Sequence, residues 1–121
     1  MTANSIYQNS LALLGEEAGS ALRLQLPAPA VISLMAAELF KINNNIRESK
    51  GLLPLSEIPS VCELDDELPF EHEVLAAMAY GLAARLIAEE DPGRGMSFDS
   101  HYENKLRSVR KASVKQINEL L

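Results

Sequence analysis

The stretch LPFEHEVLAAMAYGLAARLIAEEDPGR, residues 68–94, carries most of the structural information in this chain. Apolar side chains recur there at every fourth position, which places them on one face of a helix. They are Phe70, Val74, Met78, Leu82 and Leu86. Alanine and glycine occupy most of the remaining surface, and such small side chains let neighbouring backbones come close. The stretch therefore predicts a central helix over about residues 69–90 that is packed on more than one side.

Two helices are predicted before it. The first, over about residues 4–14, ends at Gly15, because glycine suits the left-handed conformation of a helix C-cap. The second, over about residues 29–48, begins at a proline, which suits a first helical turn. Its apolar residues step by three or four and predict a buried stripe of Ile32, Met35, Leu39, Ile42 and Ile46. The three asparagines at 43–45 have poor helix propensity, which favours either a bend or a polar contact face.

A connector and a last helix complete the predicted architecture. Residues 51–68 hold two prolines but too many apolar residues for a free linker, so we expect them to lie extended across the helices with a short strand-like piece. The segment DPGRG at 91–95 is interpreted as a stop signal, because proline and glycine do not readily continue a helix. The last helix is then expected to start near residues 97–99 and to run to the C-terminus.

The composition favours a single helical domain over residues 1–121. A chain of 121 residues is the usual size of one domain and can bury a substantial core. It has only six aromatic residues, so much of the core must be Leu, Ile, Val, Met and Ala, which suits helix-on-helix packing. We predict an all-α fold, a small bundle of four or so helices with an extended, proline-containing connector between the second and the third.

Charge is distributed unevenly along the sequence. The net charge is −6, but residues 56–103 hold twelve acidic side chains against two basic ones, and residues 104–121 hold five basic side chains against one acidic. Overall acidity argues against a surface that coats nucleic acid. The last helix nevertheless carries a basic strip of Arg107, Arg110, Lys111 and Lys115. Two interpretations stay open for this strip: a solvated helix end, or a contact with a partner or with DNA phosphates.

No motif for catalysis or for a cofactor is found in the sequence. His72, His101 and Cys62 lack the spacings of metal sites and the local signatures of nucleophile–base pairs. We therefore expect no enzyme activity, no metal and no cofactor. The N-terminal residues do not resemble a signal peptide, and the weakly charged stretch 74–87 is too short to cross a bilayer. The sequence predicts a soluble, cytoplasmic protein with no membrane contact.

Residues 68–94 and the segment FDSHYENKLRSVR, residues 98–110, resemble the small helical head–tail connector (neck adaptor) proteins of tailed phages and prophages. In that family an acidic turn with Leu-Pro precedes a helix rich in alanine and leucine, here with the core LAARL at 82–86. An acidic stop follows, then a helix opened by an aromatic residue and a tyrosine, here Phe98 and Tyr102. The segment NSLALLG at 9–15 also resembles the opening helix of such adaptors, whereas residues 16–60 match only in length and helicity.

The resemblance implies a structural role in virion assembly. Family members form a ring below the portal, extend the DNA channel and join the DNA-filled head to the next neck or tail protein. By this resemblance the chain would assemble with itself and with a portal protein, first in the host cytoplasm and then in the virion neck. Its segments near 16–28 and 51–67 would reorder on assembly. The alternative is a cytoplasmic regulatory or adaptor domain that binds a protein or duplex DNA through the basic last helix.

Overall fold

The chain forms five helices in a computed structural model, which describes the backbone of residues 1–16 and 22–120 and the side chains of residues 1–16 and 22–111. The helices are α1 (Ala3–Leu14), α2 (Leu22–Gln25), α3 (Ala28–Ser49), α4 (His72–Ile87) and α5 (Pro92–Leu120). The described part of the chain contains no β-strand, so the predicted all-α fold is confirmed. The one-turn helix α2 was not predicted, and residues 17–21 of the segment expected to reorder lie outside the described residues.

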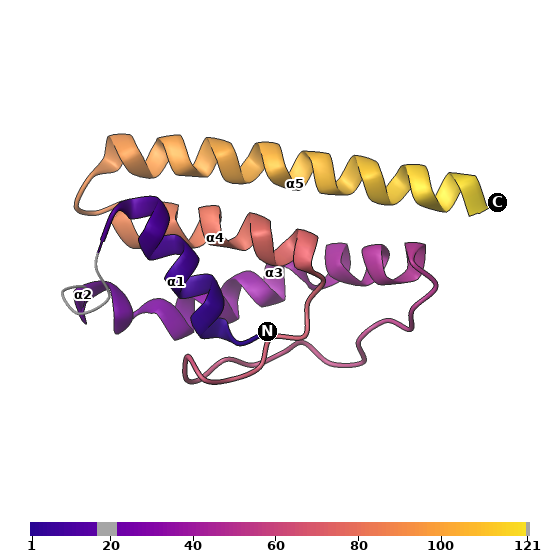
Figure 1. The fold of residues 1–121 in the computed structure, drawn as a ribbon, viewed down its shortest axis with the longest axis horizontal. Helices are drawn as coiled ribbons and strands as arrows, with labels where there is room; N and C mark the ends of the chain where they lie inside the picture. The colour runs from indigo at the N-terminus through magenta and orange to yellow at the C-terminus, as the bar shows by residue number, and fades with distance from the viewer. Residues whose placement is uncertain (17–21, 121) are drawn as a thin grey trace.

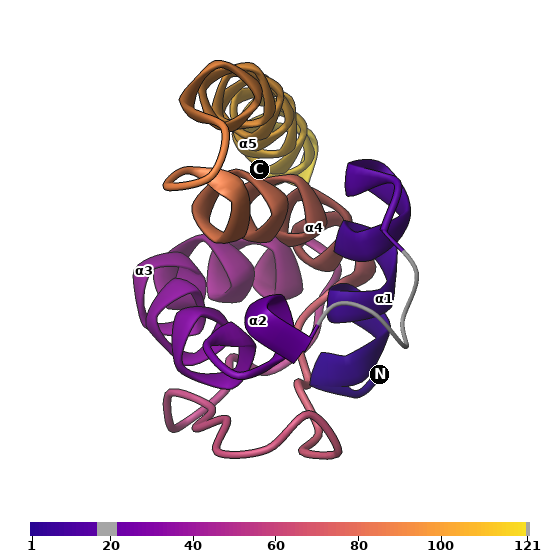
Figure 2. The same cartoon turned by 90° about the vertical axis from the view of Figure 1, so that its left-hand side faces the viewer.

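Helix α4 lies at the centre of the bundle (Figures 1 and 2). Helix α5 runs antiparallel to it on one side, α3 packs on the other side, and α1 crosses it. Eleven of the sixteen residues of α4 are buried, including most of its alanines. Ser10 in α1 fixes one of these contacts, because its hydroxyl donates to the carbonyl oxygen of Ala79 at 2.8 Å. Small residues on several faces of α4 thus allow three helices to approach it.

The start of α5 corrects one prediction. The segment DPGRG does not only end the central helix; α5 begins within it, at Pro92, several residues before the predicted start. Asp91 caps the new helix, since its Oδ1 accepts a hydrogen bond from the N–H of Arg94 at 3.2 Å. Pro92 then occupies the first helical position, where its missing N–H costs nothing. The central helix is correspondingly shorter than predicted and ends at Ile87, before a turn at 88–90.

The asparagines of α3 do not bend the helix, which continues to Ser49. Asn43 is fully buried, and its Oδ1 accepts from the N–H of Glu71 at 2.7 Å, just before α4 begins. Asn44 exchanges two hydrogen bonds with the backbone of Leu55, of 2.8 and 3.2 Å. Two of the three asparagines therefore hold the ends of the connector against α3. Of the two predicted alternatives, the asparagines form a polar contact face, and this face contacts the connector of the same chain.

The connector between α3 and α4 is extended, as predicted, and passes along one side of the bundle (Figure 2). Val61 and Leu68 are buried, whereas Leu53 and Ile58 are exposed. Its strand-like part is limited to a single antiparallel bridge between Thr2 and Glu67. The expected apolar anchoring is thus only partial.

By length and composition alone, the stretch Leu22–Ser49 is also apolar enough to cross a membrane. In the structure its main part, α3, contacts α4 and α5 and buries Ile32, Met35 and Leu39. Only 28% of the apolar window is buried among the described residues.

Candidate functional site

The basic strip on α5 is the candidate site, because its described cations are exposed and unpaired. Arg107, Arg110 and Lys111 are all exposed, and none forms an ion pair with a side chain that the structure describes. Lys115 lies farther along α5, and its side chain is outside the described set. Arg107 and Lys111 are one turn apart and share one side of the helix.

The opposite face of α5 holds the helix on the bundle. Tyr102 and Leu106 are buried, and Phe98 and Val109 are partly buried against the core. The remaining basic side chain of this region, Lys105, lies over the ring of Tyr80 at 5.0 Å. The strip therefore points away from the bundle, while α5 continues past the start of α4 towards the C-terminus (Figure 1).

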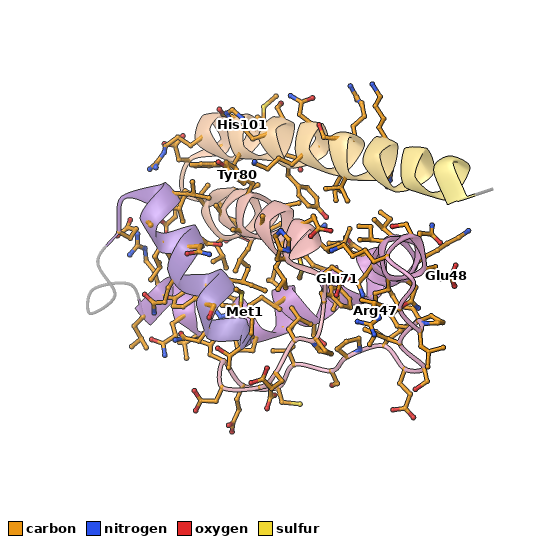
Figure 3. All side chains as sticks on the ribbon, turned by 45° about the vertical axis from the view of Figure 1, so that its right-hand side comes forward. Met1, Arg47, Glu48, Glu71, Tyr80 and His101 are labelled. Carbon is orange, nitrogen blue, oxygen red and sulfur yellow. The ribbon has the colours of Figure 1, made fainter. Side chains whose placement is uncertain are left out.

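Several other cations of the chain form ion pairs with acidic side chains of the same chain. At the end of α3, Arg47 pairs with Glu71 at 3.4 Å (Figure 3). Beside it, Lys50 pairs with Glu73 at 2.8 Å. The hydrogen bond to Glu73, aided by Glu71, raises the pKa of the Lys50 ammonium. Burial alone would raise the pKa of the Glu73 carboxyl, but the contact with Lys50 leaves it below the usual value. These charges join the end of α3 to the start of α4.

A second group of ion pairs ties the α4–α5 turn to the N-terminal region. Arg23 bonds to Glu90 at 2.6 Å and to Glu16 at 3.0 Å, and the bond from Arg23 holds the pKa of the Glu90 carboxyl below its usual range. Arg94 donates to the carbonyl oxygen of Leu14 at 2.9 Å. Lys41 on α3 is also exposed and, like the cations of the basic strip, forms no ion pair with a described side chain.

The histidine and acidic side chains do not gather into one cluster in the described part of the molecule. No group of three or more His, Cys, Asp or Glu residues that could hold a metal ion is found among the described side chains. His72 pairs with Glu73 at 2.7 Å on the surface, and His101 lies beside Tyr80, 5.7 Å between ring centroids (Figure 3). The two histidines therefore belong to separate surroundings.

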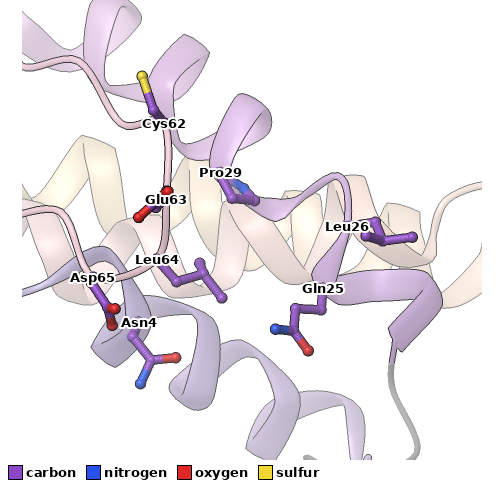
Figure 4. Close-up of a pocket in the computed structure, with 8 residues that line it drawn as sticks. All are labelled: Asn4, Gln25, Leu26, Pro29, Cys62, Glu63, Leu64 and Asp65. Atoms are coloured by element: carbon purple, nitrogen blue, oxygen red, sulfur yellow. The ribbon is translucent and has the colours of Figure 1, made fainter.

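A hollow between α1, α2 and the connector has a volume of about 410 Å³ (Figure 4). Cys62, Glu63 and Asp65 line it, and no histidine or lysine is among the lining residues that the structure describes. The nearby Asp66 accepts hydrogen bonds from the N–H groups of Glu63 and Cys62, and these bonds lower the pKa of its carboxyl. Its carboxylate thus stabilises a turn of the connector.

Sequence reasoning missed the exposed apolar side chains Leu34 and Ile58. The signal was present for Leu34, since it falls outside the predicted stripe of α3.

No protein-family model matches this sequence, no curated protein matches it, and no solved structure matches the fold.

Proposed function

We propose that this chain is a head–tail connector (neck adaptor) of a tailed phage or prophage, which forms a ring below the portal and joins the DNA-filled head to the tail. The resemblance of residues 68–94 and 98–110 to that family supports the proposal. The observation that carries it is the placement of charge on the α4–α5 hairpin: cations without ion-pair partners lie along α5, and acidic side chains without ion-pair partners lie at the α4–α5 turn.

The acidic end is the α4–α5 turn, where Glu89 and Asp91 form no ion pair with a described residue. Arg107 lies sixteen residues after Asp91 on α5, about 24 Å away at the rise of an α-helix. A ring requires two different lateral surfaces on each subunit, so that the front of one copy contacts the back of the next. Opposite charges at the two ends of one hairpin favour such an alignment and disfavour two like ends meeting.

In this function the strip of Arg107, Arg110, Lys111 and Lys115 docks on the portal protein or on an adjacent subunit. The next neck or tail protein binds the other side of the ring. DNA passes through the channel and meets the chain only there, and a net negative subunit holds phosphates weakly. The role is structural and involves no bond chemistry.

The experiment is co-expression with the portal protein encoded nearest to this gene, followed by electron microscopy of the purified mixture. We expect rings on the portal with the wild-type chain and loss of them with the Arg107→Glu, Lys111→Glu double variant. Lys41→Glu is the matched control, because Lys41 is also an exposed, unpaired cation but lies on α3. The absence of rings with the wild-type chain, or rings that survive the double variant, would contradict the proposal.

The same free cations also favour a second function, a regulatory or adaptor domain that binds a protein or duplex DNA through α5. Duplex binding would weaken steeply with salt, and Lys111→Glu would lower the slope of log K against log salt by about 1. A duplex affinity that is unaffected by Lys111→Glu would exclude α5 as the DNA contact.

A further inference from the structure

A row of four charged side chains on α5 changes sign at its middle. Asp99, Glu103, Arg107 and Lys111 follow one another at intervals of four residues, and such a row forms a ridge on a helix surface. All four are exposed, and none forms an ion pair with a side chain that the structure describes. This charged ridge is therefore acidic in its first half, basic in its second half, and open to solvent along its length.

The charged ridge lies on a side of α5 that the bundle leaves free. Tyr102 and Leu106, on another side of the helix, are buried and hold α5 on the bundle. In Figures 1 and 2, α5 forms one edge of the molecule, with α4 beside it. One flank of the ridge is neutral, since Met96 is 73% exposed and Ser100 and Asn104 are exposed and short. A second helix can therefore approach the ridge without meeting the bundle.

The order of the charges makes the ridge complementary to a second copy of itself that runs in the opposite direction. A two-fold axis between Glu103 and Arg107 brings Glu103 of each copy opposite Arg107 of the other. The same axis brings Asp99 opposite Lys111, because both pairs are centred on the same point of the helix. Each contact occurs twice, as in every isologous pair. A parallel arrangement in the same register would instead set like charges against each other.

The spacing also selects one register. A shift by one helical turn brings Glu103 opposite Glu103 of the second copy in one direction, and Arg107 opposite Arg107 in the other. Opposed like charges disfavour these alternatives. Ridges with a spacing of four residues pack side by side when two helices cross at about −50°. The charged ridges of two copies can thus lie along each other over the turns that carry the four residues.

The nature of the contact determines its strength. Ion pairs between exposed side chains each contribute little, and salt screens them. Two helices that cross at this angle also touch over only a few turns, so the contact is smaller than the interface of a permanent dimer. A pair held in this way is weak, reversible and favoured by low ionic strength.

We propose that two copies of this chain pair in solution through the charged ridge of α5, antiparallel and about a two-fold axis. The pair covers Arg107 and Lys111, which belong to the basic strip. Because an isologous pair is closed, it cannot grow into a ring, and it must open before the strip can dock elsewhere. The inference goes beyond the proposed function and does not depend on it, since it states what covers the strip in the free chain.

Charge reversal tests the pairing, with sedimentation equilibrium of the full-length chain at low ionic strength as the measurement. Glu103→Lys and Arg107→Glu each set like charges against each other twice in the pair and should raise the dissociation constant about tenfold. The double variant Glu103→Lys, Arg107→Glu restores opposite charges and should recover wild-type association to within about twofold. Such recovery within one chain is expected because residue 103 of one copy faces residue 107 of the other.

Lys41→Glu is the matched control for charge. It reverses an exposed, unpaired cation on α3 and changes the net charge as Arg107→Glu does, so it should associate like the wild type. Added salt should weaken the pairing of the wild type and of the double variant alike. A double variant that associates no better than the single variants, or a Lys41→Glu variant as weak as they are, would overturn the pairing.

Cross-linking tests the two-fold geometry. In a Cys62→Ser background, which removes the exposed native thiol, Asn104→Cys and Met96→Cys variants are each treated with a short bis-maleimide. Asn104 is beside the axis, so its variant should link to a second copy of itself. Met96 is exposed on the same helix, but two copies of it would lie more than about 20 Å apart at helical rise. Equal dimer yields from the two variants, or no dimer from Asn104→Cys, would contradict the two-fold pair.

Other occupants of the strip give a different result. A wild-type chain that stays monomeric at low ionic strength, while Arg107→Glu removes its binding to the portal or to duplex DNA, assigns the strip to those partners and ends the inference. A ridge-dependent pair in a chain that binds no portal keeps the inference and removes the connector function.

Discussion

The ring of Tyr102 in α5 lies against the backbone of Gly81 in α4. A β-carbon built on Gly81 would come within 2.9 Å of Tyr102 Cδ1 and within 2.6 Å of the terminal methyl of Met35. Both distances are shorter than a van der Waals contact between carbon atoms. The three helices α3, α4 and α5 therefore meet at a position where only glycine fits without rearrangement.

Gly81→Ala should destabilise the protein. Overpacking of a core costs about 1–3 kcal/mol, and alanine in a helix returns up to about 1 kcal/mol, so we expect a net loss of about 1–2 kcal/mol in the free energy of unfolding in urea. Gly93→Ala is the control, because a β-carbon there meets nothing closer than Asp91 Oδ1 at 3.6 Å. That variant should be as stable as the wild type or slightly more so. Equal free energies of unfolding for the two variants would show that Met35 and Tyr102 move aside at little cost.

Tyr102 should make the fold sensitive to alkali. Burial raises the pKa of Tyr102 to about 12 from 10.0, so between these values the unfolded chain loses a proton that the folded chain keeps. The unfolded state then binds fewer protons, and stability falls as the pH rises through this window. The loss is about 1–2 kcal/mol when solvent screening is allowed for.

Tyr102→Phe removes this ionisation and should flatten the decline between pH 10 and 12, as measured by urea unfolding at several pH values. A smaller decline should persist, because burial also raises the pKa of Tyr7. An alkaline decline identical in the variant and the wild type would assign it to other groups.

Asp91→Ala should weaken the start of α5. The variant loses the side-chain oxygen that accepts from the N–H of Arg94, and the loss of an N-cap costs about 0.5–2 kcal/mol. Asp91→Ser retains an acceptor and should recover most of this stability. Thermal unfolding of the three proteins measures the effect, and a serine variant no better than alanine would argue against capping.

Asn43→Ala should cost about 1–3 kcal/mol, because it leaves the N–H of Glu71 without its acceptor in a partly buried position. Asn45→Ala is the control, since Asn45 is exposed on the same helix and should change stability little. In the described structure Asn43 Nδ2 has no hydrogen-bond partner, so part of the cost of burying this amide is already present in the wild type. Equal unfolding midpoints for the two variants would mean that the bond to Glu71 contributes little.

The sequence reasoning was reliable where one local rule determined the structure. Gly15 has φ 73° and ends α1, as a C-cap glycine should, and the four-residue apolar period placed α4 correctly. The prediction failed at DPGRG, residues 91–95, because the residues that end one helix also begin the next. The hydrogen bond from the N–H of Arg94 to Asp91 Oδ1 shows the second role. Local composition cannot separate these roles.

The candidate site was predicted only in part, for a physical reason. The spacing of Arg107 and Lys111 identified a basic strip, but whether a cation is paired depends on contacts with distant parts of the chain. Arg23 illustrates this, since its partner Glu90 is 67 residues away. The exposure of Leu34 and Ile58 depends in the same way on where the connector lies, which no helical period encodes.

The position of α1 has a consequence for synthesis on the ribosome. Its buried face packs mainly on α4, and Ser10 reaches a carbonyl that is 69 residues later in the chain. The first helix to be translated must therefore remain without its docking surface until the second half of the polypeptide has emerged. Nascent chains arrested before residue 87 should be sensitive to proteases, and protection should arise in one late step.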